Sequence, residues 1–105
     1  VQPGKIVGVG ANYRSFLDAK KREYPKHPRI FLKPASSVIG NQEKILCPDG
    51  SHEVHFEGEL GVVIGKICSK VSEKKAMDYV FGYTCINDGS DHAGRRWNLG
   101  ARKSC

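Results

Sequence analysis

Two glutamates separated by a single residue, Glu57 and Glu59, are the side chains of this sequence best suited to chemistry. They begin a stretch, residues 55–66, that becomes apolar toward its end and is typical of a β-strand. Because side chains alternate between the faces of a strand, both carboxylates point the same way, with Cα atoms roughly 7 Å apart. Like charges at that spacing repel, and a divalent cation between them would turn the repulsion into binding.

Other interpretations of this stretch stay open. Two acids at alternate positions also fit a solvated strand edge that has no ligand. His55 falls on the same face as Glu57, so a His-x-Glu-x-Glu metal site is a further alternative, beside a surface histidine. Gly58 leaves the opposite face bare, where another backbone could approach closely. Oxygen ligands favour hard cations such as Mg²⁺ and Ca²⁺.

Short strands and short helices must position these residues. Apolar patterns predict strands at residues 5–9, 30–33, 55–66 and 81–86. Helices are predicted after two serines that can cap them, Ser15 and Ser72, over residues 15–22 and 72–80. Gly8 and Gly10 form a Gly-x-Gly without the third glycine of a dinucleotide fingerprint. These elements predict a β-rich α+β fold.

Composition narrows the class of protein. The 105 residues form one domain at most, with no apolar run near the roughly 20 residues of a membrane span and no export signal. Four scattered cysteines without a Cys-x-x-Cys pair predict neither a zinc site nor disulfides, which favours a cytoplasmic protein. The formal charge is +6, but the basic residues do not alternate with aromatic residues that could stack on bases. We therefore expect no nucleic-acid partner and no membrane partner.

Five motifs together resemble the fumarylacetoacetate hydrolase family. They are KIVGVGANY (residues 5–13), FLKPASS (31–37), HFEGELGVVIGK (55–66), AMDYVFGY (76–83) and ND (87–88). Their order and spacing are similar to those of the family, and five motifs in register make the match specific. The resemblance implies a mixed β-sandwich or roll with short helices, of which residues 1–88 would be the N-terminal part.

The resemblance also assigns a metal site. It implies that Glu57, Glu59 and Asp88 bind Mg²⁺ or Mn²⁺, with Ca²⁺ as a further candidate, and that waters or substrate complete the shell. In the family the position of His55 is not a ligand, so we favour an outer or surface role for it. The third acid follows the strand predicted over residues 81–86.

The activity implied by the resemblance is metal-dependent hydrolysis of C–C bonds. The expected substrates are acylpyruvates or other small keto acids and diketo acids, which react through a metal-chelated enolate and bind near Asn12, Tyr13 and Lys33. For Lys33 a plain surface position is an equal alternative. Oxaloacetate decarboxylase, keto-acid hydratase and isomerase activities share the enolate and stay open, as does a non-catalytic metal-binding or interaction remnant. Family members are commonly homodimers.

One departure from the family affects proton transfer. Many acylpyruvate-cleaving members have a histidine and a glutamate on the helix after Asn-Tyr, and these activate the attacking water. The corresponding positions here are Phe16 and Ala19, neither of which can move a proton. The catalytic residues are therefore unassigned, and an active protein would need a base elsewhere or a different reaction.

A second departure begins after Asp88. Residues 89–105 form a basic tail without an apolar period, and we expect no regular structure there. We hypothesise that this tail is a frameshift product, because a one-base shift of one codon choice for residues 89–103 gives Ala-Ala-Thr-Met-Gln-Ala-Ala-Asp-Gly-Thr-Trp-Val-Arg-Ala-Lys, similar to the family's continuation. Sequencing the gene should show a single-base shift that opens a family-like frame; the lack of one refutes the hypothesis.

Overall fold

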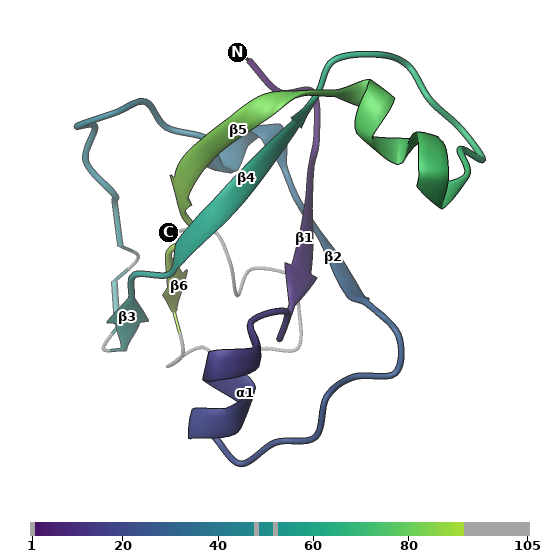
Figure 1. The fold of residues 1–105 in the computed structure, drawn as a ribbon. Coiled ribbons are helices and arrows are strands. Elements are labelled where there is room, and N and C mark those ends of the chain that lie inside the picture. Colours follow the sequence, from purple (N-terminus) through teal and green to yellow (C-terminus); the bar gives the residue numbers. More distant parts are fainter. Residues whose placement is uncertain (1, 48, 52, 92–105) are drawn as a thin grey trace. The chain divides into compact units, whose positions relative to one another are not determined.

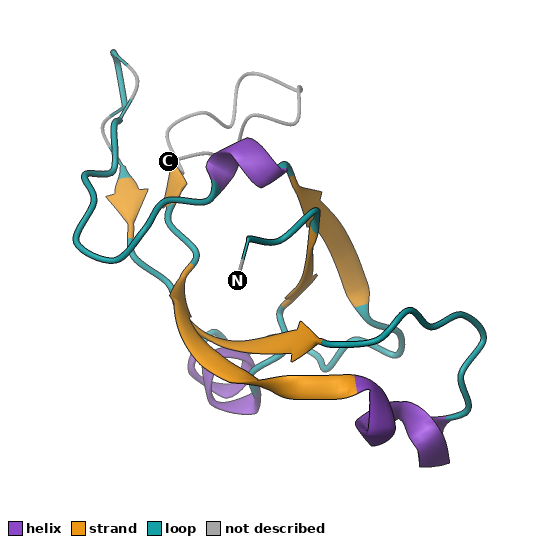
Figure 2. Cartoon of the chain, turned by 90° about the horizontal axis from the view of Figure 1, so that it is seen from above, coloured by secondary structure: helices purple, strands orange, loops and turns teal. Residues whose placement is uncertain are grey.

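The computed structural model describes residues 2–47, 49–51 and 53–91, which divide into two compact units (Figure 1). The first unit ends at Leu46 and the second begins at Cys47. Each unit is built on antiparallel strand pairs and contains short helices, as the colouring by secondary structure in Figure 2 shows. The β-rich α+β class is therefore confirmed.

The first unit is organised by the pairing of β1 (Ile6–Gly10) with β2 (Arg29–Lys33). Gly8 lies opposite Phe31, and a Cβ atom on Gly8 would lie 2.1 Å from Cζ of Phe31. The aromatic ring thus occupies the space that any side chain at position 8 would need. Glycine is required there for close packing between strands, and not for phosphate binding.

Helix α1 (Arg14–Ala19) follows β1, but its start differs from the prediction. Tyr13 is the N-cap residue and no side chain caps the helix, so Ser15 lies inside the first turn. The helix also ends three residues before the expected Arg22, close to Lys21 with a φ of 50° in the left-handed region. The helix places Leu17, 4% exposed, in the interior of this unit.

The second unit contains one long antiparallel ribbon. Strand β4 (Gly58–Ile64) pairs with β5 (Val80–Asn87), and β3 (Val54–His55) pairs with β6 (Ser90–Asp91). From β3 to Val63, the numbers of two partner residues always add up to the same value. The β3–β6 pair and the β4–β5 pair therefore continue one another in a single register. We call residues 54–64 together with residues 80–91 the ribbon.

The ribbon corrects several expectations. The single strand expected over residues 55–66 is interrupted, because Phe56 and Glu57 lie between β3 and β4. The expectation of no regular structure after Asp88 is wrong for Ser90 and Asp91, which form β6; residues 92–105 lie outside the described part. Ser51 supports this end of the ribbon by donating a hydrogen bond of 2.6 Å to Oδ2 of Asp91.

The helical segment before β5 also differs from the prediction. It is a 3₁₀ helix, η2 (Glu73–Tyr79), that Figure 1 shows leading into β5. Ser72 is the N-cap residue as predicted, but its side chain makes no capping hydrogen bond. Nowhere in the described part of the chain is there a helix with the length and apolar character needed to cross a membrane.

The hydrogen bond made by Tyr24 allows the structure of the first unit to be tested. Its hydroxyl donates a 2.6 Å hydrogen bond to Oδ1 of Asp18, joining the segment after α1 back to that helix. This bond, with some desolvation and the carboxylate charge, raises the pKa of Tyr24 above the ordinary 10.0. The bond needs a protonated phenol, so its contribution to stability is complete below about pH 10 and is lost as pH rises through the raised pKa.

We expect tyrosinate absorbance during an alkaline titration, taken as the difference between the wild-type protein and Tyr24→Phe, to show a transition above pH 10. In Asp18→Asn, which removes the carboxylate charge beside the hydroxyl, the transition should move back toward the ordinary value. Identical transitions with and without the Asp18 carboxylate would contradict this account.

Candidate metal centre

The register of the ribbon brings three acidic residues to one face. The backbone N–H of Asp88 donates to the carbonyl of Glu57 at 2.8 Å, so these residues lie opposite each other. Glu59 is two residues further along the same strand and faces Ile86. Directly opposed residues, like residues two apart, have side chains on the same side of the sheet. We call Glu57, Glu59 and Asp88 the acidic triad.

Burial distinguishes the members of the acidic triad. Asp88 is 9% exposed, whereas Glu57 and Glu59 are half-buried. Aspartate is rarely this buried unless it has a partner, because taking its charge out of water is costly. A buried carboxylate beside two further acids is a better candidate for cation binding than a row of acids on a solvated edge.

Asn87 fixes the backbone between the acids. Its Oδ1 atom accepts a hydrogen bond of 3.0 Å from the backbone N–H of Glu57, in place of a carbonyl of the facing strand. The side chain thereby joins the two strands where the regular ladder between β3 and β4 is broken. The sequence shows Asn87 directly before an acid at the end of a strand, but no local pattern reveals its partner thirty residues away.

The three carboxylates of the acidic triad are suited to a hard divalent cation, although they do not lie close together. No group of three His, Cys, Asp or Glu residues in the described ranges is placed closely enough to hold a metal ion. The acidic triad therefore shares a face without forming a closed cage. Three carboxylates provide oxygen ligands of the kind that Mg²⁺, Mn²⁺ and Ca²⁺ prefer, and a cation would offset their mutual repulsion.

Two glycines shape the surroundings of the acids. A Cβ atom on Gly61 would lie 2.5 Å from Cδ1 of Ile86 and 2.9 Å from Cγ2 of Thr84. Gly61 therefore allows Ile86 to lie across the face, directly beside Glu59. A Cβ atom on Gly58 would meet no described atom within 4 Å, so the expected close approach of another backbone is not seen there.

The three predicted substrate-binding residues belong to the first unit. Lys33 is half-buried and pairs with Ile6 at one end of the β1–β2 ladder, whereas Asn12 and Tyr13 follow the other end. The ladder from Ile6 to Gly10 spans roughly 14 Å, so it separates Lys33 from the other two. Their role in substrate binding stays a prediction.

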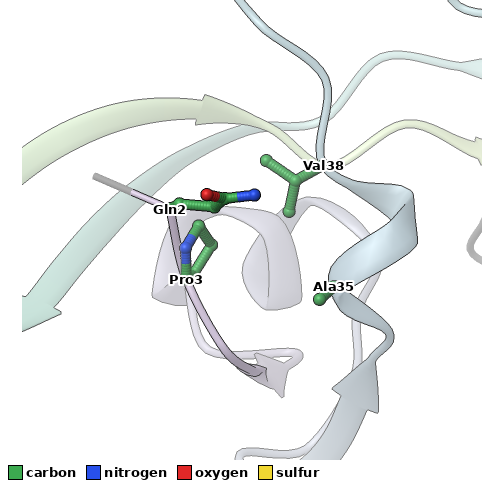
Figure 3. A pocket seen from close by; sticks show the side chains of 4 residues that line it. All are labelled: Gln2, Pro3, Ala35 and Val38. Atoms are coloured by element: carbon green, nitrogen blue, oxygen red, sulfur yellow. The ribbon is translucent and has the colours of Figure 1, made fainter.

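The same unit contains a hollow of about 400 Å³, shown in Figure 3. Its lining residues are Gln2, Pro3, Ala35 and Val38. Ala35 begins the short 3₁₀ helix η1 (Ala35–Ser37). None of these four side chains is acidic, basic or nucleophilic, so the hollow does not supply the missing proton-transfer group.

His55 continues the ribbon beyond the acidic triad. It lies in β3 opposite Ser90 and has an exposed side chain. By the register His55 lies on the same face as the acidic triad, two residues before Glu57. This position is compatible with the outer or surface role that we favoured and leaves the ligand alternative untested.

Comparison with known proteins identifies the family. Residues 5–103 match the family described as fumarylacetoacetate (FAA) hydrolase C-terminal. An uncharacterised protein of Archaeoglobus fulgidus is 44% identical over 88 residues, which are 84% of this chain and 35% of that protein. A fumarylacetoacetate hydrolase domain-containing protein 2 homolog of Dictyostelium discoideum is 41% identical over 99 residues, which are 94% of this chain and 32% of that protein.

A solved structure agrees with this assignment. The 5-carboxymethyl-2-hydroxymuconate delta-isomerase of Mycobacterium smegmatis has a TM-score of 0.80 and 36% identity, over 93% of this chain and 39% of that chain. The chain thus spans about a third of the length of the relatives it matches. The family match continues past Asp88, where we expected the resemblance to end, and the origin of residues 89–105 stays a prediction.

The role of Asn87 can be tested by amide hydrogen exchange. In Asn87→Ala the amide of Glu57 loses its acceptor and should exchange about five- to tenfold faster, since a single hydrogen bond contributes about 1 kcal/mol. The amide of Gly65, which donates to the Tyr79 carbonyl at the far end of the ribbon, should be unchanged. Asn87→Asp retains an acceptor oxygen and should retain the protection. Equal exchange of the Glu57 amide in all three proteins would contradict the assignment.

Proposed function

Because the chain belongs to the fumarylacetoacetate hydrolase family, we propose that it supplies the acidic face of a metal-dependent site that cleaves C–C bonds of acylpyruvates or related diketo acids. The observation that carries this proposal is the register that places Glu57, Glu59 and Asp88 on one face. Mg²⁺ or Mn²⁺ is the proposed cofactor, with Ca²⁺ as the alternative.

Each predicted residue has a distinct part in this proposal. The acidic triad would hold the cation, which, when bound, polarises the carbonyl groups of a keto acid and stabilises the negative charge left by C–C cleavage. Asn87 orients the backbone of Glu57, and Ile86 borders Glu59 with an apolar side chain. Asn12, Tyr13 and Lys33 are the proposed contacts to the substrate.

A reaction without an activated water is the second candidate. Phe16 and Ala19 lie in α1 at the positions that would carry the family's histidine and glutamate, and neither exchanges protons. Decarboxylation of oxaloacetate needs no attacking water, and isomerisation of a keto acid adds no water but still moves a proton from one carbon to another. The lack of this pair is the observation that supports oxaloacetate decarboxylation as the second candidate, whereas isomerisation would need a proton-transfer group elsewhere in the chain.

Calorimetric titration of the full chain with Mg²⁺ and Mn²⁺ tests the site. We expect saturable binding in the wild-type protein, and Glu57→Gln or Asp88→Asn should weaken it by at least about a hundredfold, since even partners that only orient ligands are worth 10–100-fold. Glu73→Gln removes the same charge from the exposed start of η2 and should leave the affinity within about twofold. Equal losses in all three variants would show that only net charge matters.

A turnover assay then separates the activities. Acylpyruvates, oxaloacetate and fumarylacetoacetate are offered to the chain with and without the cation. Metal-dependent consumption of oxaloacetate alone supports the decarboxylase, and cleavage of the diketo acids supports the hydrolase. Saturable cation binding without turnover of any substrate leaves the non-catalytic metal-binding remnant.

A further inference from the structure

The first unit carries the whole net charge of the chain. Residues 1–46 contain nine Lys and Arg against three Asp and Glu, an excess of +6 that equals the formal charge of the complete sequence. Six of these nine basic residues lie between Arg14 and Arg29, in α1 and in the stretch that Figure 1 shows joining α1 to β2. We call residues 14–29 the basic segment. Two acids, Asp18 and Glu23, accompany its six bases, so the segment attracts anions.

A hollow of about 390 Å³ lies against the basic segment. Its lining residues are Leu17, Arg22, Glu23 and Arg29. Leu17 is buried, whereas the three charged residues are exposed. Neither arginine forms an ion pair or a side-chain hydrogen bond with any residue that the structure describes. Both guanidinium groups are therefore available to a ligand, and the volume lies in the range of roughly 300–1,000 Å³ that is typical of small-molecule sites.

The end of α1 fixes the position of Arg22. Lys20 is the C-cap residue, and Lys21 after it has a φ of 50° in the left-handed region. The N–H of Lys21 donates to the carbonyl of Asp18 at 3.0 Å. The N–H of Arg22 donates to the carbonyl of Leu17 at 2.9 Å. These two bonds form a Schellman motif, which folds the chain back over the last turn of the helix and holds Arg22 beside Leu17.

The other arginine is held by the sheet, and the stretch between the two is restricted. Arg29 is the first residue of β2 and belongs to the ladder with β1. Before it, the hydroxyl of Tyr24 is bonded to Asp18 at 2.6 Å, and Pro25 and Pro28 each fix one backbone angle. A ligand that contacts both arginines therefore meets a stretch that is already largely ordered, which lowers the free energy lost in ordering it on binding.

We propose that this hollow binds a small organic phosphate through Arg22 and Arg29. A guanidinium group presents paired N–H donors that match two oxygens of a phosphate or a carboxylate. A terminal phosphate carries three oxygens on one phosphorus atom, so two guanidinium groups can bind it together, whereas a carboxylate has two oxygens to share between them. Leu17 adds an apolar side chain to the lining, suited to the carbon part of such a ligand. Glu23 contributes an opposing charge that reduces the affinity.

Calorimetric titration of the full chain with glycerol 1-phosphate, at low salt and in EDTA, tests the site. We expect saturable one-to-one binding that Arg22→Gln or Arg29→Gln weakens by at least about tenfold, the effect of losing one hydrogen bond between charged groups. Glu23→Gln should strengthen binding several-fold, because it removes a like charge from the lining. Lys26→Gln removes a positive charge from an exposed position of the basic segment outside the lining and should leave the affinity within about twofold.

Amide hydrogen exchange provides the control for folding. The N–H of Arg22 donates to the Leu17 carbonyl and should stay protected in every variant, so that a lost affinity reports the loss of a guanidinium group and not of the turn. Arg29→Gln changes a residue on the other side of the hollow, in β2, and serves as the test should the turn open in Arg22→Gln.

Four results would overturn the proposal. The folded chain would bind no glycerol 1-phosphate, or Lys26→Gln would weaken binding as much as the two arginine variants, which would show that only net charge matters. Succinate would bind as tightly as glycerol 1-phosphate, which would assign the site to carboxylates. A single-stranded oligonucleotide would bind more tightly through the same arginines, which would assign it to a nucleic-acid backbone. The titrations contain neither a divalent cation nor a keto acid, so none of these results bears on the proposed metal site.

Discussion

The 2.8 Å hydrogen bond from the backbone of Asp88 to the carbonyl of Glu57 is the interaction on which the candidate site depends. It spans the interruption between β3 and β4 and keeps one register along the ribbon. A slip of one residue would turn Glu57 and Glu59 toward the apolar side and bring Leu60 and Val62 to the acidic side. The two faces of the ribbon are thus fixed together, and the chemistry of one cannot change without the packing of the other.

Those parts of the structure that follow from short-range patterns were predictable from the sequence. Alternation along residues 55–66 was enough to place Glu57 and Glu59 on one face, because side-chain direction in a strand follows from residue number. The apolar runs at Ile6–Gly10 and Val80–Asn87 were strands for the same reason, within a residue or two at each end. The family resemblance added Asp88, which no local pattern connects to the two glutamates.

The features that the sequence did not reveal depend on partners far along the chain or on the energy of a single cap. Asn87 accepts its hydrogen bond from Glu57, thirty residues away, and this bond accompanies the break in the expected long strand. Ser90 and Asp91 become a strand only because β3 offers a ladder to them. Ser15 had the right side chain for a cap, but capping contributes about 1 kcal/mol, and α1 begins one residue earlier without such a bond.

Cation binding and the pairing of the strands in the ribbon are coupled. The proposed cation would bind the acidic triad only when the strands carrying Glu57 and Asp88 are paired. Any ligand that binds an ordered state better than a disordered one stabilises that state by mass action. The cation should therefore stabilise the pairing of these strands, and linkage requires that any other interaction that stabilises the pairing strengthen cation binding in turn. Because two strands alone are only marginally stable in water, the ribbon is expected to bind the cation more weakly the less completely its strands are paired.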